Sequence, residues 1–146
     1  MRASDVMVKE VVTVGEEVSV SDLCDILQQA HANGAPVVNA DGMLVGVVTE
    51  EDILYGSMGS PRAASVPDAG AVSEQPSAVS DTLVGDIMTS PAVCATEDTD
   101  VVELCQLMWQ MRIHRIPIVR DGRVTGIVSA LDLVRAIAEG RIRVGR

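Results

Sequence analysis

The sequence predicts an α/β protein made of two similar halves, each with the order strand, helix, strand, strand, helix. The first observation behind this prediction is an internal repeat: residues 5–38 match 86–119, and residues 41–52 match 121–132 after one residue drops out, with fifteen identities. The second is that helical spacing alternates with short apolar runs in both copies. Because a unit of about 50 residues buries too little surface to be stable alone, we expect the copies to pack face to face around a pseudo-twofold axis.

In the first copy, strands are expected at 11–14, 35–38 and 44–48. Between the first two strands, apolar residues recur at helical spacing behind the possible caps Ser19 and Ser21, namely at Val20, Leu23, Cys24, Leu27 and Ala30. Asn33-Gly34 is expected to end this helix, Asp41-Gly42 to form a hairpin turn, and a second helix to begin at about Thr49.

The second copy repeats this order, with strands expected at 93–95, 116–119 and 124–128. Its first helix has the stripe Val101, Leu104, Cys105, Met108 and Met111. A turn is expected at Asp121-Gly122, and the last helix at 129–139 with Gly140 past its end. The chain therefore divides into a first motif at 1–55, a linker at 56–81 and a second motif at 82–146.

The predicted linker has the composition of a flexible segment. Of its 26 residues, 17 are Ser, Ala, Gly or Pro, and it lacks apolar periodicity. Such a segment cannot bury enough surface to offset the entropy lost on ordering. We expect a spacer, the alternative being a segment that docks on a partner.

Composition and charge exclude several classes of function. The chain has a net charge of −10, and its only aromatic residues are Trp109 and Tyr55. Nucleic-acid binding relies on cations that neutralise phosphates and, for single strands, on aromatic stacking, so we expect no nucleic-acid partner. No apolar stretch approaches the length of a membrane span or forms a leader, which predicts a cytoplasmic protein without membrane insertion.

The three cysteines have no metal-ligand spacing and no disulfide pattern. Cys24 and Cys105 occupy equivalent repeat positions on apolar helices, and Cys94 lies in a short apolar run, so all three are expected in the core. No metal site is predicted. The sequence also lacks a nucleophile elbow and a Cys–His pair at recognisable spacing, so we expect no catalytic residues and no enzyme activity.

The most informative motif is an apolar strand containing Gly, followed by Thr or Ser and an Asp three residues later. It occurs at Gly46–Asp52 and again at Gly126–Asp132. A capping box, which involves no ligand, explains each copy by itself. However, a strand that leads into a helix also offers free N–H groups to an anion, and an Asp one turn in can accept hydrogen bonds from the two hydroxyls of a ribose. The duplicated context therefore favours a nucleotide.

A second motif joins the first helix of each copy to its second strand, at 31–38 and 112–119. With both motifs, the repeat and the element order, the chain resembles the cystathionine β-synthase (CBS) domain family over all but the linker and the last residues. The resemblance implies a tandem pair of βαββα CBS repeats, also called a Bateman module. It also implies two clefts that bind AMP, ADP, ATP or S-adenosylmethionine, with Mg²⁺ accompanying ATP.

The resemblance implies two unequal clefts. In the stronger one, Asp52 would bind ribose and Thr49 would lie near phosphate, with His114 and Arg115 contributing to phosphate binding, as in the regulatory subunit of AMP-activated protein kinase. Its base contacts would come from Met7, Val12 and Ala32. The weaker cleft faces the uncharged Asn33 and Gly34, and would use Asp132, Ser129, Met88, Val93 and Ile113. Glu50 and Glu51 would repel a phosphate at the stronger cleft unless they point away or Mg²⁺ intervenes, and Arg115 and Arg112 have an alternative role at a helix end.

The sequence thus predicts a stand-alone regulatory protein that senses an adenosine-containing nucleotide and signals to a partner chain. The alternative is a constitutive structural dimer that binds no nucleotide. A homodimer is expected in either case, because more apolar helix surface is present than one small core can cover. The surface assigned to this contact consists of Leu23, Leu27, Leu104 and Met108, with the helices at Ile53-Leu54 and Leu133-Val134.

Overall fold

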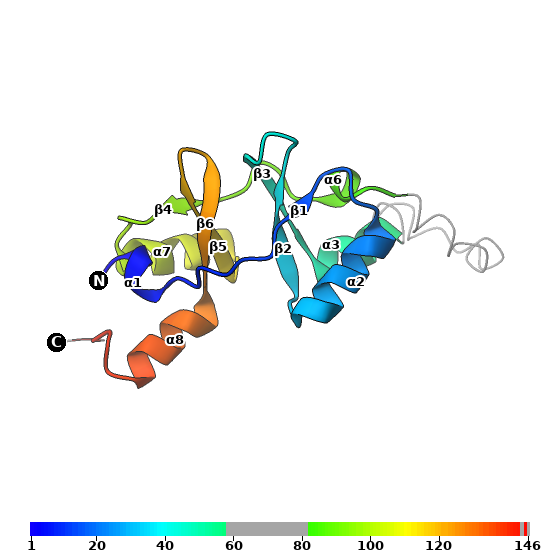
Figure 1. Cartoon of the computed structure of the whole chain (residues 1–146). Helices are drawn as coiled ribbons and strands as arrows, with labels where there is room; N and C mark the ends of the chain where they lie inside the picture. Colours follow the sequence, from blue (N-terminus) through cyan, green and yellow to red (C-terminus); the bar gives the residue numbers. More distant parts are fainter. Residues whose placement is uncertain (58–81, 144, 146) are drawn as a thin grey trace. The chain divides into compact units, whose positions relative to one another are not determined.

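The structure is a computed structural model that describes residues 1–57, 82–143 and 145, so most of the predicted linker lies outside the described residues. The chain divides into two compact units, shown in Figure 1: unit 1 contains residues 1–11 and 93–146, and unit 2 contains residues 12–92. Each unit has one three-stranded sheet with helices. The predicted α/β class and the repeated element order are therefore confirmed.

Unit 2 contains the sheet β1-β2-β3, with strands Val14–Gly15, Gly34–Val38 and Leu44–Thr49. β1 runs parallel to β2, and β2 runs antiparallel to β3. Its helices are α2 (Val20–Ala30), α3 (Glu50–Ser57) and α6 (Val84–Ile87). The side chain of Ser19 caps α2 by accepting a hydrogen bond from the backbone N–H of Asp22, which confirms one of the two predicted caps.

Unit 1 repeats this architecture with the sheet β4-β5-β6, whose strands are Ala95–Thr96, Arg115–Arg120 and Arg123–Ser129. The parallel and antiparallel pairings are the same as in unit 2. Its helices are α1 (Ala3–Val6), α7 (Val101–Met111) and α8 (Ala130–Ala138). The predicted last helix is confirmed, since Ser129 is its N-cap and Glu139 its C-cap.

Two local expectations were wrong, and two short helices were missed. The first strands were expected at 11–14 and 93–95, but β1 and β4 begin at Val14 and Ala95, where the chain first pairs with the middle strand of its sheet. The first helix does not extend to Asn33-Gly34, because His31 adopts a left-handed conformation with φ 52° directly after α2. Arg112 ends α7 in the same way, with φ 57°. The short helices α1 and α6 were not expected.

Each unit has its own core. In unit 2 it contains Leu23, Leu27, Val37, Val48 and Val84; in unit 1 it contains Leu104, Met108, Ile116, Ile118 and Leu133. The four helix residues assigned to a dimer surface are therefore buried, at 8% exposure or less, and that assignment is wrong. The expectation of buried cysteines is also wrong, since all three are exposed. For the helix residues, both errors arose because helical spacing locates an apolar stripe but not how much of the helix the core covers.

The first residues of each motif belong to the unit that contains the rest of the other motif. Residues 1–11 complete unit 1, where Val8 pairs with Ile127 of β6 and Val6 enters the core. Residues 82–92 complete unit 2, where Thr89 pairs with Val47 of β3. The two units therefore have other bounds than the motifs at 1–55 and 82–146, which were assigned from the sequence. Those motif bounds describe the sequence repeat and stay a prediction.

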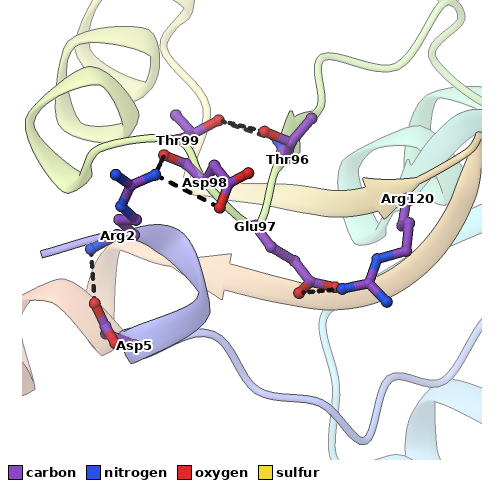
Figure 2. Close-up of polar contacts among 7 residues, drawn as sticks. All are labelled: Arg2, Asp5, Thr96, Glu97, Asp98, Thr99 and Arg120. Atoms are coloured by element: carbon purple, nitrogen blue, oxygen red, sulfur yellow. Dashed lines mark hydrogen bonds and ion pairs between the residues drawn. The ribbon is translucent and has the colours of Figure 1, made fainter.

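Polar contacts attach the N-terminal segment to unit 1, as Figure 2 shows. The backbone N–H of Arg2 donates to the Asp5 carboxylate at 2.8 Å, and the Arg2 guanidinium lies 3.5 Å from the Asp98 carboxylate. Arg120, the last residue of β5, forms an ion pair at 2.9 Å with Glu97 in the turn after β4. Two backbone bonds, from Ala3 and Ser4 to the loop after β4, complete this attachment.

Candidate functional site

In unit 2, the junction of β3 and α3 places Thr49 and Asp52 in a capping box. The Thr49 backbone N–H donates to Oδ2 of Asp52 at 2.9 Å, and its hydroxyl donates to the same oxygen at 3.2 Å. In return, the Asp52 N–H donates to the Thr49 hydroxyl at 3.4 Å. Both side chains are half-buried. The capping role is therefore present, and it uses one of the two carboxylate oxygens of Asp52.

Unit 1 has the same arrangement where β6 leads into α8. The Ser129 N–H donates to Oδ2 of Asp132 at 2.9 Å, and the Asp132 N–H donates to the Ser129 hydroxyl at 3.1 Å. Each junction is also held by one strand-to-helix bond. The Glu50 N–H donates to the Asn33 carbonyl at 2.9 Å, and the Ala130 N–H donates to the His114 carbonyl at 2.7 Å. The two motifs therefore share their backbone geometry.

The second carboxylate oxygen distinguishes the two motifs. Oδ1 of Asp52 accepts a long hydrogen bond from the Thr89 hydroxyl, at 3.4 Å. Oδ1 of Asp132 instead faces the Arg135 guanidinium at 3.8 Å, and the Asp132 side chain is only 11% exposed. Asp132 thus faces a cation of its own helix, whereas Asp52 is contacted by a neutral hydroxyl.

The residue opposite each cap also differs. Arg115 on β5 pairs in register with Ser129, and the equivalent Gly34 on β2 pairs with Thr49. A Cβ atom at Gly34 would lie 2.7 Å from the Val48 carbonyl oxygen, so no side chain fits there. Arg115 is half-buried, and its side chain makes no hydrogen bond or ion pair with the residues that the structure describes. Its guanidinium is therefore available to an anion.

The site residues predicted from the sequence are divided between the two units. Those in unit 2 are Val12, Ala32, Asn33, Thr49, Asp52 and Met88; those in unit 1 are Met7, Val93, Ile113, His114, Arg115, Ser129 and Asp132. The structure bonds Asn33 and His114 to the residue after the cap of their own unit, and it pairs Arg115 with Ser129. Each of the two predicted clefts combines residues of both units, and both clefts stay predictions.

Met7 and Met88 have a position that the sequence did not suggest. Met88 packs on Gly46 and Met7 on Gly126, each beside the strand that leads into the capping box. The sulfur atoms would lie 2.7 Å from a Cβ at either glycine. The repeated Met and Gly therefore form a contact pair, which explains why both copies keep both residues.

Sequence reasoning also missed Thr89 and Arg135. Their repeat equivalents are Val8 and Tyr55, so neither is part of the repeated pattern by which the motifs were found. The spacing of Arg135 from Asp132, three residues on a helix, was a signal that could have indicated an ion pair. The contact of Thr89 depends on how residues 82–92 pack and had no local signal.

A family model, described as the CBS domain, matches residues 3–59 and again 84–139. The chain belongs to the CBS domain family. Two solved structures show the same fold. The CBS domain pair of protein MJ0100, in complex with 5′-methylthioadenosine and S-adenosyl-L-methionine, is 26% identical with a TM-score of 0.73, covering 96% of this chain and 98% of that one. CBSX2 in complex with AMP is 25% identical with a TM-score of 0.76, covering 97% and 98%.

A curated relative shows where the similarity ends. The inosine-5′-monophosphate dehydrogenase of Methanocaldococcus jannaschii is 29% identical over 135 residues, which is 92% of this chain but 23% of the dehydrogenase. The CBS pair thus corresponds to about a quarter of that enzyme. In the part of the chain that the structure describes, no helix has the length and apolarity needed to cross a membrane.

Proposed function

We propose that this CBS pair is a regulatory protein that binds an adenosine-containing ligand and communicates its occupancy to a partner chain. The observation that carries the proposal is the strand-to-helix junction, at which Asp52 keeps Oδ1 outside its capping box, with only a long contact from Thr89. A carboxylate oxygen in that position suits the hydroxyls of a ribose. The adenosine ligands of the MJ0100 and CBSX2 structures support the same class of ligand.

For the phosphorylated ligands AMP, ADP and ATP, the proposal assigns ribose to Asp52 and phosphate to Arg115, with Thr49 and His114 beside it. Arg115 is supported by its lack of a partner among the described residues, and arginine suits bidentate contacts to phosphate. Glu50 and Glu51 are exposed at the start of α3 and oppose an anion there. Mg²⁺ bound with ATP would relieve that repulsion. S-adenosylmethionine, which has no phosphate, does not need Arg115.

Signalling requires that the ligand bind one arrangement of the protein more tightly than another. We propose no catalytic step, and the regulated partner is a separate protein. The proposal also includes self-association into a homodimer. The second candidate function is a constitutive structural dimer, which is favoured by the capping boxes, since these stabilise the fold without any ligand.

Calorimetric titration with AMP, ADP, ATP, NAD and S-adenosylmethionine tests the proposal. We expect saturable binding of at least one adenosine ligand, lost in Asp52→Ala. Asp25, an exposed carboxylate of unit 2, serves as the matched control for charge, so Asp25→Ala should leave binding unchanged. If no ligand of the panel binds the folded wild-type protein, the sensor proposal fails and the structural dimer is favoured.

A further inference from the structure

Asp132 has an internal partner at each of its two carboxylate oxygens. Oδ2 accepts the Ser129 N–H at 2.9 Å within the capping box, and Oδ1 lies 3.8 Å from the Arg135 guanidinium. The Asp132 side chain is only 11% exposed, whereas that of Arg135 is 64% exposed. A ligand that approaches Asp132 therefore meets Oδ1 with a cation already beside it.

The equivalent carboxylate of unit 2 has no cation on its own helix. Asp52 stands at the repeat position of Asp132, and Tyr55 stands at the repeat position of Arg135. Helix α3 contains no basic residue, whereas Arg135 is the one basic residue of α8. Tyr55 is 56% exposed, and its hydroxyl makes no hydrogen bond with the residues that the structure describes. The two motifs thus share a capping box but not the charge one turn further along the helix.

The contact between Asp132 and Arg135 needs no ligand to form. Residues three apart lie on the same side of a helix, so the two side chains meet as soon as α8 forms. Asp132 lies in the first turn of the helix and Arg135 in the last, where the helix dipole favours each charge. An ion pair with an exposed partner changes an equilibrium constant by up to about fivefold. The guanidinium is therefore beside Oδ1 whenever α8 is folded, but a ligand can displace it.

A ribose and the guanidinium require the same oxygen of Asp132. The hydroxyls of a ribose donate hydrogen bonds to a carboxylate, and the capping box already uses Oδ2 of Asp132. Oδ1 is then the acceptor that is left, and Arg135 competes for it. At Asp52, the corresponding oxygen has only the 3.4 Å contact from the neutral Thr89 hydroxyl. Binding of ribose at Asp132 must therefore displace a charge, and binding at Asp52 does not.

We propose that Arg135 is a specificity-determining residue, which lowers the affinity of Asp132 for ribose by competing with the ribose hydroxyls for Oδ1. The chain then has one strong site for an adenosine ligand, at Asp52, because its own arginine occupies the second copy of the motif. This inference rests on the proposed function, since it assigns ribose to the equivalent carboxylate of both motifs. It goes beyond that function by naming the residue that makes the two sites unequal. Replacement of Arg135 should strengthen the second site.

The first experiment measures the site at Asp132 by calorimetric titration with adenosine, which has no phosphate. The titrated chain has Asp52→Ala, so that the other site is removed. In this background, Arg135→Gln should tighten adenosine binding about two- to fivefold. Arg143→Gln removes another exposed cation of unit 1 and should have no effect. If circular dichroism shows that Asp52→Ala impairs folding, Asp52→Asn, which retains a side-chain oxygen for the cap, takes its place.

The reciprocal variant introduces the arginine into unit 2. In a chain that is otherwise wild type, Tyr55→Arg places a guanidinium three residues after Asp52 and should weaken adenosine binding there about two- to fivefold. Tyr55→Gln removes the ring without adding a charge, and it is the matched control that should bind as the wild type does. A Tyr55→Arg chain that binds adenosine as tightly as the wild type overturns the proposal.

Two measurements distinguish competition for Oδ1 from a role of Arg135 in helix stability alone. Arg135→Lys retains a cation beside Asp132, so it should keep adenosine binding weak, in contrast to Arg135→Gln. Salt screens an exposed ion pair, so raising NaCl from about 0.05 to about 0.5 M should tighten binding in the chain with Arg135 but not in Arg135→Gln. A purely stabilising residue would change the melting temperature and neither of these affinities.

The outcomes separate this proposal from the sensor function. If Arg135→Gln leaves adenosine binding at Asp132 unchanged while the wild type still binds at Asp52, this proposal is overturned and the sensor function stands. If Arg135→Gln instead weakens binding of AMP at Asp132, the arginine contacts phosphate, and the proposal is likewise overturned. Binding that appears in Arg135→Gln but is absent from the wild type supports the proposal and overturns the sensor function. Absence of binding from both chains overturns both.

Discussion

The two units have the same backbone plan but differ in the charge around the same motif. In unit 2, the helix after the capping Thr49 begins with three carboxylates, and glycine lies opposite the cap. In unit 1, that helix begins Ala130-Leu131-Asp132, with Arg115 opposite the cap and Arg135 beside Asp132. A repeated motif therefore does not imply a repeated chemical environment. The difference suggests that the two Asp residues have diverged in role.

The largest difference between the two units is expected when each Asp is removed in turn. We expect Asp52→Ala to abolish high-affinity binding of a phosphorylated adenosine ligand, and Asp132→Ala to leave most of it, because Asp132 already faces Arg135. Calorimetric titration measures both. Each Asp also caps a helix, so both variants must first match the thermal stability of the wild type or be compared below their melting temperature. Loss of binding in Asp132→Ala alone would reverse the assignment.

A substitution of Arg115 distinguishes the contribution of phosphate to ligand binding from that of ribose. If it contacts phosphate, Arg115→Ala should weaken AMP or ADP by about 1.5–3 kcal/mol, the usual contribution of a hydrogen bond to a charged group. Binding of adenosine should change far less. The repeat-equivalent Gly34 offers no matched variant, since a Cβ there would clash with the Val48 carbonyl oxygen, so Arg123→Ala on the next strand serves as the charge control. Equal losses for AMP and adenosine would contradict the phosphate role.

The glycines beneath the two methionines allow a comparison of packing. Gly46→Ala would place a Cβ 2.7 Å from the Met88 sulfur and 2.8 Å from the Thr89 carbonyl oxygen. In Gly126→Ala, the Met7 sulfur is equally close, but the Val8 carbonyl oxygen is 3.1 Å away. A methionine side chain can move, whereas a paired backbone oxygen cannot. We expect both variants to be destabilised by about 1–3 kcal/mol, with Gly46→Ala the more so. Urea denaturation, with equal m-values, would measure the difference.

The sequence predicted the repeat, the order of elements and both capping boxes, because these depend on local spacing and turn chemistry. Thr49–Asp52 and Ser129–Asp132 lie within one turn, and their bonds follow from the residue types alone. It did not predict that Thr89 and Arg135 contact the second oxygens, since one contact depends on packing of a distant segment and the other breaks the repeat.

The dimer surface was assigned to the wrong residues for a related physical reason. Leu23 and Leu104 satisfy the helical pattern and were assigned to a dimer surface, yet both are 0% exposed. Val102 and Trp109 lie outside the repeated stripe, and their repeat equivalents Ser21 and Gln28 are polar. A repeat emphasises what two halves share, which is their core. The residues that distinguish one half from the other are found by comparing the copies at positions where they disagree.

The smallest expected effect concerns how firmly residues 1–11 are attached to unit 1 and residues 82–92 to unit 2. Asp5 accepts a hydrogen bond from the Arg2 N–H at 2.8 Å, and Asp86 accepts the equivalent bond from the Leu83 N–H at 3.2 Å. Only the first segment adds an ion pair, between Arg2 and Asp98, since Leu83 stands at the position of Arg2. Asp5 and Asp86 are the third residues of α1 and α6, and the loss of one such hydrogen bond costs about 1 kcal/mol. Asp5→Ala should therefore lower stability by about 1 kcal/mol, and Asp86→Ala by less.

Amide hydrogen exchange can localise this effect, because Val8 and Thr89 each pair with the last strand of the sheet in their unit. Asp5→Ala should increase exchange at Val8 without changing Thr89, and Asp86→Ala should do the reverse. Such separate responses are expected if each segment opens with its own unit as a local event. Faster exchange at both Val8 and Thr89 in either variant would show instead that the two units unfold as one cooperative body. The units would then differ in the chemistry of their capping motifs but not in their stability.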